Sequence, residues 1–164
     1  AIVGGGDTAC EEASYLSTLA EKVYLVVRKD YLRASDIMQK RVLNNPKIEV
    51  LFNHNVEGLF GESKVQGMKL VKNLGKEDES HYEKEIDGFF LAIGHNPNSE
   101  LFKEYLETDS IGYIKTIADT PCTAIPGVYA AGDVADPRYR QAIIAAASGA
   151  KAAMEAERYL QELG

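Results

Sequence analysis

The glycine-rich segment near the start of the chain constrains the fold more than any other feature. Two apolar residues lead directly into Gly4-Gly5-Gly6, and small and apolar residues at helical spacing follow. This order predicts a strand, a tight turn and a helix. The spacing of Gly4, Gly6 and Ala9 is typical of a turn that lets the backbone approach a pyrophosphate and lets the helix pack closely on the strand. We expect the first-turn N–H groups of the helix to face phosphates.

The residue that follows the turn carries a negative charge. Asp7 is unfavourable beside a phosphate, so we expect its carboxylate to cap the helix by accepting a backbone N–H from the first turn. Glycine-rich turns also form for steric reasons alone, and a purely structural role for the turn stays open at this point.

A basic cluster stands where an NAD-binding site would place an acid. The apolar run 23–27 predicts the second strand, and Arg28 and Lys29 follow it directly, with Arg33 shortly after. A carboxylate here would bind the ribose 2′-hydroxyl of NAD, whereas cations attract the 2′-phosphate of NADP. One charge-assisted hydrogen bond contributes about 1.5–3 kcal/mol, enough to change cofactor preference about tenfold. The cluster predicts NADP; the alternative is a solvated basic loop.

Residues 1–52 predict the pattern of one mononucleotide-binding half of a doubly wound sheet. The spacing of Ala9, Ala13, Leu16 and Ala20 predicts a helix whose small residues pack on a sheet. A second helix is expected from Ser35-Asp36 to Leu43, ended by residues 44–46, and a third strand at 48–52. The fold class is therefore α/β, with the order β-α-β-α-β.

The character of the chain changes after residue 55. Short runs at 56–60, 65–71 and 81–85 predict an antiparallel meander in place of a crossover helix. The nearly continuous apolar run 87–93 is typical of a strand buried on both faces. Gly and Pro at 94–97 predict a break and a domain boundary.

Residues 95–164 predict fewer elements. We expect helical turns at 101–106, short strands at 112–116 and 128–131, and a long Ala-rich helix over 141–160. About 70 residues with so few strands form a poor independent core. The chain also begins only three residues before the glycine turn, so little of the first strand precedes it. We therefore expect this to be the C-terminal part of a longer protein. The long helix is expected to bury one stripe: Ile143, Ala147, Ala150, Met154 and Ala153.

Composition excludes several classes of function. A net charge of -7 at pH 7 argues against nucleic acid or an anionic membrane as the main partner. No apolar run approaches the ~18 residues of a membrane span. Cys10 and Cys122 lie far apart and form no Cys-x-x-Cys, which favours a reduced, cytoplasmic setting in which each is a small buried hydrophobe. No metal site is expected.

A second cluster of ligand-type residues lies late in the chain. Gly132-Asp133 is expected at the carboxyl end of a strand, where ligands of α/β sheets bind. Arg140-Gln141-Ala142 opens the final helix, whose positive end favours an anionic ligand such as a reduced flavin. The residues alone leave open that Asp133 caps a turn and that Arg140 pairs with a surface carboxylate.

Four blocks occur in an order that resembles the low-molecular-weight, bacterial-type thioredoxin reductases. They are Gly4 to Ala9, Arg28-Lys29 with Arg33-Ala34, Ala92 to Asn98, and Ala130 to Ala142. The resemblance covers essentially the whole chain, and the last block is the most specific. It implies an FAD-dependent, NADPH-oxidising homodimer that reduces thioredoxin. Its NADP-binding domain, Rossmann-like, would be residues 1–94, and residues 95–164 would be the second half of a discontinuous FAD-binding domain.

The resemblance also implies roles for individual residues. Gly4 to Ala9 would hold the pyrophosphate, Arg28, Lys29 and Arg33 the 2′-phosphate, and 94–97 would form an interdomain hinge. No catalytic residue is expected here, because the family's Cys-x-x-Cys lies upstream of the glycine turn. The full set of expected cofactor-binding residues is Gly4, Gly5, Gly6, Asp7, Thr8, Ala9, Arg28, Lys29, Arg33, Ile93 and Gly94, with Gly132, Asp133, Val134, Arg140, Gln141 and Ala142 for FAD.

The chain departs from the family pattern in three places. The Cys-x-x-Cys and the first FAD-binding Gly-x-Gly-x-x-Gly are absent, and Val27-Arg28-Lys29 stands where the family commonly has His-Arg-Arg. Lysine keeps the charge but loses the bidentate fork of arginine.

The alternatives to a thioredoxin reductase are an NADPH–ferredoxin reductase or the reductase of a peroxidase system on the same scaffold, and a non-catalytic NADP-binding module.

Overall fold

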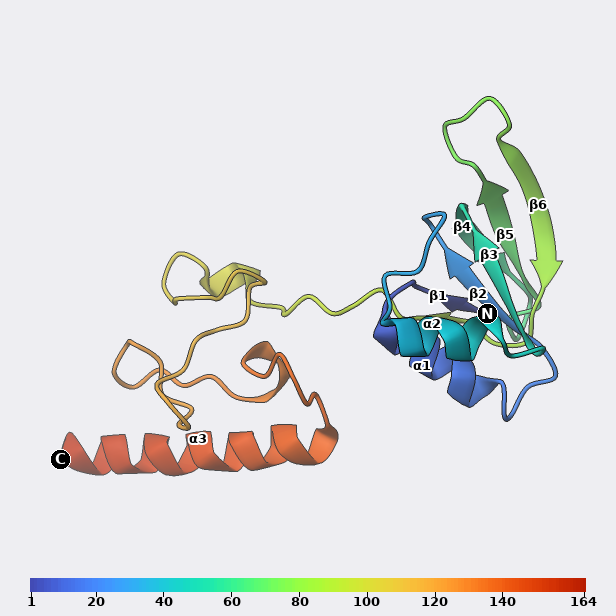
Figure 1. Ribbon diagram of the computed structural model, residues 1–164. Helices are drawn as coiled ribbons and strands as arrows, with labels where there is room; N and C mark the ends of the chain where they lie inside the picture. Colours follow the sequence, from blue (N-terminus) through green and yellow to red (C-terminus); the bar gives the residue numbers. More distant parts are fainter. The chain divides into compact units, whose positions relative to one another are not determined.

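The predicted strand, turn and helix are present at the start of the chain in the computed structural model, which describes residues 1–164 (Figure 1). Strand β1 spans Ile2–Val3, and helix α1 spans Asp7–Leu16. The helix ends before Ala20, which nevertheless packs against the core from the following turn. The chain forms two compact units, Ala1–Gly94 and His95–Gly164, which are described separately.

A four-stranded parallel sheet forms the centre of the first unit. Strands β2 (Val23–Val27), β3 (Ile48–Phe52) and β7 (Phe90–Leu91) join β1 in the order β3-β2-β1-β7. Helix α2 (Asp36–Leu43) connects β2 to β3. All three pairings are parallel, so the predicted β-α-β-α-β order is confirmed, and β1 lies in the middle of the sheet where the crossovers reverse direction.

The predicted antiparallel meander is also confirmed. Strands β4 (His54–Phe60), β5 (Gly67–Lys72) and β6 (Ser80–Glu85) form a separate three-stranded sheet in that order. The pairing of β4 with β5 shifts register between Val56 and Gly58, which is a β-bulge.

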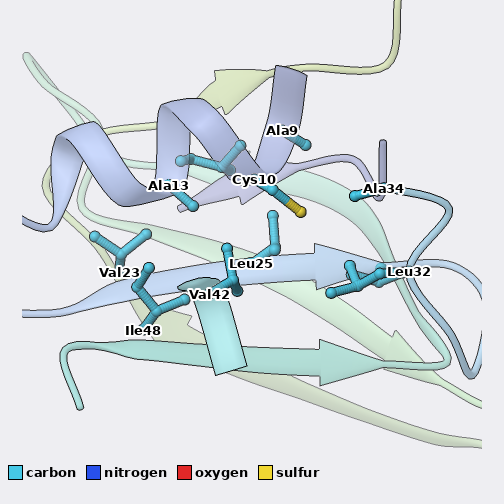
Figure 2. Packing of buried hydrophobic residues seen from close by; sticks show 11 residues of the cluster. Ala9, Cys10, Ala13, Val23, Leu25, Leu32, Ala34, Val42 and Ile48 are labelled. Atoms are coloured by element: carbon cyan, nitrogen blue, oxygen red, sulfur yellow. The ribbon is translucent and has the colours of Figure 1, made fainter. Parts of the chain in front are cut away.

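The parallel sheet is covered on both faces, and β2 shows why. Successive side chains of a strand point to opposite faces. Val23, Leu25 and Val27 pack in the cluster that α1 and α2 cover, as Figure 2 shows for Val23 and Leu25 beside Ala13 of α1 and Val42 of α2. Val26 belongs instead to the cluster that contains Met68 and Leu70 of β5. Helices, parallel sheet and meander thus form three layers.

The expectation of a doubly buried strand at 87–93 is wrong. Only Phe90 and Leu91 form a strand, and they are 47% and 63% exposed. β7 is the edge of the sheet and pairs with β1 alone. A continuous apolar run predicts a strand but does not show whether both faces will be covered, because that depends on the layers around it.

The second unit has less regular structure than predicted. The helical turns expected at 101–106 are a 3-10 helix, η1, at Glu100–Phe102. The two strands expected at 112–116 and 128–131 are single bridges, Thr108 with Ile114 and Cys122 with Tyr129. Neither bridge extends into a ladder, and backbone N–H groups in these segments bond elsewhere instead, Ile114 to the Val134 carbonyl and Val128 to the Ile125 carbonyl. The buried core is small: Leu106, Ile114 and Ala130.

Helix α3 (Ala142–Glu162) confirms the predicted long helix, but the predicted buried stripe is wrong. No residue of α3 is buried, and Ile143 and Met154 are 76% and 54% exposed. The face that meets the rest of the unit carries Ser148, whose Oγ accepts the Gly132 N–H, and Tyr159, which lies against Gly127. The alanines of α3 are distributed around the whole helix, so the spacing of its apolar residues does not identify the packed face. No helix in the structure combines the length and apolarity needed to cross a bilayer.

Candidate functional site

The glycine turn has the geometry that its spacing predicts. The Gly4 N–H donates to the Val26 carbonyl at 3.0 Å, which joins the turn to β2. A Cβ on Gly4 would lie 2.8 Å from the Ala9 Cβ and closer still to the Ala92 carbonyl oxygen. Ala9 is fully buried. Gly4 and Ala9 therefore let the strand and α1 pack tightly.

Gly6 has the opposite surroundings. A Cβ built on it would meet nothing within 4 Å. Gly6 is also the N-cap residue of α1, and no side chain caps this helix end. Protein packing does not require glycine at this position, and the open space beside an uncapped helix N-terminus has the form of a phosphate cradle.

The expectation that Asp7 caps α1 is wrong. Its Oδ1 accepts the backbone N–H of Ser35 at 2.9 Å and the hydroxyl of Ser35 at 2.7 Å. Ser35 is the N-cap residue of α2. The Ser35 hydroxyl and N–H lower the pKa of the Asp7 carboxyl below its usual value. Asp7 instead joins the starts of two helices that are 28 residues apart in the chain.

The basic loop is held against the glycine turn. The Arg33 N–H donates to the Gly5 carbonyl at 2.7 Å. Leu32 and Ala34, on either side of Arg33, are buried in the same cluster as α1. This alternation leaves the Arg33 side chain exposed at the surface beside the turn.

The three cations of this region are available for a ligand. Arg28, Lys29 and Arg33 are exposed, and none of them takes part in any of the chain's ion pairs. This is notable in a chain with a net charge of -7. The arrangement leaves uncompensated positive charge, which favours an anion.

A groove of about 600 Å³ brings the turn and the cations together. Six of the predicted residues line it: Gly4, Gly5, Arg28, Lys29, Arg33 and Ile93. Apolar side chains line the groove as well: Val56, Leu59, Phe89 and Leu91. A polar, cationic side and an apolar side suit a ligand that combines phosphates with a flat ring.

Sequence reasoning missed the contribution of β4 to this groove. His54, Asn55, Val56, Gly58 and Leu59 line it. His54 is held by two contacts, because its Nδ1 lies 2.6 Å from the Phe52 carbonyl oxygen and its Nε2 lies 2.8 Å from the Tyr82 hydroxyl. The signal that could have found this wall is Gly58 within a strand pattern, since such a glycine often marks a bulge near a ligand.

Some predicted residues do not line the groove. Gly6, Asp7, Thr8, Ala9 and Gly94 are absent from its wall. Ala9 acts through packing and Asp7 through Ser35, as described above. Thr8 is exposed at the start of α1.

Of the residues expected to bind FAD, Gly132 lines a cavity of the second unit. This cavity of about 330 Å³ is also lined by Ala145 and Ser148 of α3. The other five residues expected to bind FAD do not line it. Gly132–Val134 is a 3-10 helix, η2, so the expected place at the end of a strand is wrong. The Arg140 guanidinium donates to the Pro137 carbonyl, and Gln141 is the N-cap of α3. Val134 packs against the small core.

The two cysteines are free thiols. Cys10 is fully buried on α1, as expected for a small hydrophobe, and Cys122 is half-buried. Burial, together with the nearby Asp7 carboxylate, raises the pKa of the Cys10 thiol. A raised pKa disfavours the reactive thiolate, so Cys10 contributes packing.

Comparison with known proteins gives a consistent result. The pattern of the pyridine nucleotide-disulphide oxidoreductase family matches residues 1–149. The chain is 48% identical to the mitochondrial thioredoxin reductase of Kluyveromyces lactis, over 99% of this chain and 46% of that protein. It is 50% identical to the thioredoxin reductase of Schizosaccharomyces pombe, over 99% and 50%. The chain spans about half the length of the curated relatives it matches.

A solved structure agrees with these matches. The crystal structure of thioredoxin reductase from Streptococcus pyogenes superposes with a TM-score of 0.82 at 36% identity, covering 98% of this chain and 52% of that one. The α/β fold with its parallel and antiparallel sheets is therefore the fold of part of such structures.

Proposed function

The chain belongs to the pyridine nucleotide-disulphide oxidoreductase family, and we propose that residues 1–94 bind NADPH as part of a thioredoxin reductase. In this proposal residues 95–164 supply the second half of an FAD-binding domain. The three proteins compared above are named thioredoxin reductases, which favours this function over a ferredoxin reductase or a peroxidase reductase on the same scaffold.

One observation carries the nucleotide assignment. The groove places three cations without acidic partners beside an open glycine turn, within a single unit. The open side of Gly6 would accept the pyrophosphate, and Arg28, Lys29 and Arg33 would bind the 2′-phosphate. A solvated basic loop would not require the hydrogen bond that holds Arg33 to Gly5. The supporting geometry favours NADPH over NADH.

FAD, when bound, would supply the redox chemistry between NADPH and the disulfide through which thioredoxin is reduced. The residues of this chain would bind and orient the nucleotide for that transfer. A homodimer and a cytoplasmic location are parts of the same proposal, although one of the relatives above is mitochondrial.

Titration of the chain with each reduced nucleotide tests the proposal. The chain contains no tryptophan, so the intrinsic fluorescence of NADPH and NADH reports binding without interference from that source. We expect the dissociation constant for NADPH to be lower by about tenfold or more, because NADPH alone carries the 2′-phosphate. Equal affinities would contradict the assignment of the basic cluster.

A second measurement concerns the flavin. We expect this chain to retain FAD weakly, because in this proposal residues 95–164 supply only the second half of the FAD-binding domain, and Asp133, Arg140, Gln141 and Ala142 do not line the cavity that Gly132 lines. Absorbance near the visible flavin bands after gel filtration with excess FAD measures this. A stoichiometric yellow complex would show that residues 95–164 form a flavin site by themselves.

A further inference from the structure

Two hydrogen-bonded links join the basic loop to the glycine turn. The Arg33 N–H donates to the Gly5 carbonyl, and the Ser35 N–H and hydroxyl donate to the Asp7 carboxylate. The linked residues are two apart on both segments. Ala34, which lies between the two linked loop residues, points into the core.

The two links differ in whether a side-chain substitution can remove them. The bond from Arg33 to Gly5 uses backbone atoms only, so any residue except proline can make it at position 33. The second link depends on the Asp7 carboxylate, whose Oδ1 accepts both Ser35 donors. Asp7 is therefore the one side chain of the turn that holds the end of the loop.

The charge of Asp7 makes a purely incidental contact a poor explanation. A carboxylate at the first helical position lies next to the open turn where phosphates are proposed to bind, and like charges repel. The helix end does not use this carboxylate as a cap. Asp7 Oδ1 accepts two hydrogen bonds from Ser35, at the end of the loop that carries the cations.

We propose that Asp7 is a positioning residue, which holds the basic loop against the glycine turn and so sets the preference for a 2′-phosphorylated nucleotide. This inference rests on the proposed function. Asp7 acts through Ser35, which fixes where the chain leaves the loop. Arg33 makes the first link through its own N–H and lies two residues before Ser35, so loss of the Asp7 bonds would loosen the segment that presents its exposed side chain to the groove.

The test compares substitutions of Asp7 in the 164-residue chain. Asp7→Ala removes both bonds, and we expect it to raise the dissociation constant for NADPH about fivefold while that for NADH stays within about twofold. Asp7→Asn keeps an oxygen that accepts the same two donors, and we expect it to retain the wild-type preference. Glu11→Ala, which removes an exposed carboxylate from the same helix, is the charge control.

Two further readouts separate positioning from general stability. Amide hydrogen exchange at Arg33 and Ser35 should accelerate in Asp7→Ala but not in Asp7→Asn, with little change in melting temperature. A double variant, Asp7→Ala with Ser35→Ala, should bind NADPH no more weakly than Asp7→Ala alone, because both changes remove the same contact.

The possible outcomes distinguish this inference from the proposed function. If wild-type chain binds NADPH and NADH equally, the proposed function fails and the inference fails with it. If the wild type prefers NADPH and Asp7→Ala keeps that preference unchanged, the inference alone is overturned. A loss of preference in Asp7→Ala that Asp7→Asn restores supports it.

Discussion

Replacing Arg28 by alanine should raise the dissociation constant for NADPH between about tenfold and a hundredfold and leave that for NADH nearly unchanged. Arg28 follows β2 directly, lines the groove and forms no ion pair within the chain. A charge-assisted hydrogen bond to a 2′-phosphate contributes about 1.5–3 kcal/mol, which corresponds to that range. NADH has no group for the guanidinium to bind. Fluorescence titration with both nucleotides measures the two constants.

Two variants provide controls for Arg28. Arg28→Lys keeps the charge but loses the bidentate fork, so we expect an intermediate loss of NADPH affinity. Lys64→Ala removes an exposed cation from the meander, and it should change neither constant. Equal weakening of both nucleotides by Arg28→Ala would place the arginine elsewhere than at the 2′-phosphate.

Replacing Gly6 by alanine should abolish most binding of both nucleotides without destabilising the chain. The new Cβ would meet no protein atom within 4 Å, and the backbone φ of -95° is one that alanine adopts readily. The methyl group would instead occupy the space proposed for the pyrophosphate, which NADPH and NADH share. We expect both dissociation constants to rise by about tenfold or more, with the melting temperature nearly unchanged. Unchanged binding of both would remove the turn from the nucleotide site.

Gly4→Ala is the contrasting variant of the same turn. Its Cβ would lie 2.8 Å from the Ala9 Cβ and closer to the Ala92 carbonyl oxygen. Neither neighbour is a flexible side-chain end, and overpacking of this kind typically costs about 1–3 kcal/mol. We expect a clear fall in the free energy of unfolding, measured by denaturant titration. The two glycines thus separate the packing function of the turn from its proposed binding function.

Candidate residues of the site could be predicted from the sequence, but the hydrogen bonds that join its segments could not. Spacing identified Gly4, Gly6 and Ala9, and charge identified Arg28, Lys29 and Arg33, because residue type and separation carry that information. The partner of Asp7 could not be predicted. A carboxylate at the start of a helix usually accepts a first-turn N–H, and only the approach of α2 brings Ser35 closer.

The faces of the elements were harder to predict than the elements themselves. The long helix was expected to bury Ile143 and Met154, yet both are exposed, and Ser148 and Tyr159 face the rest of the unit. The run that contains Phe90 was expected to be buried, yet it is a sheet edge. Both errors have one cause: apolar residues on several sides of an element do not specify which side meets a neighbour.

The sequence by itself determined the order of strands and helices in residues 1–94, the tight turn and the positive charge that follows β2. These depend on local spacing and residue type, which the chain carries whatever surrounds it. Only the tertiary structure decided that β4 supplies a wall of the groove, that Asp7 bonds to Ser35, and that α3 leaves its apolar side chains exposed. These features depend on contacts between segments far apart in the chain, and such contacts exist only once the layers have packed.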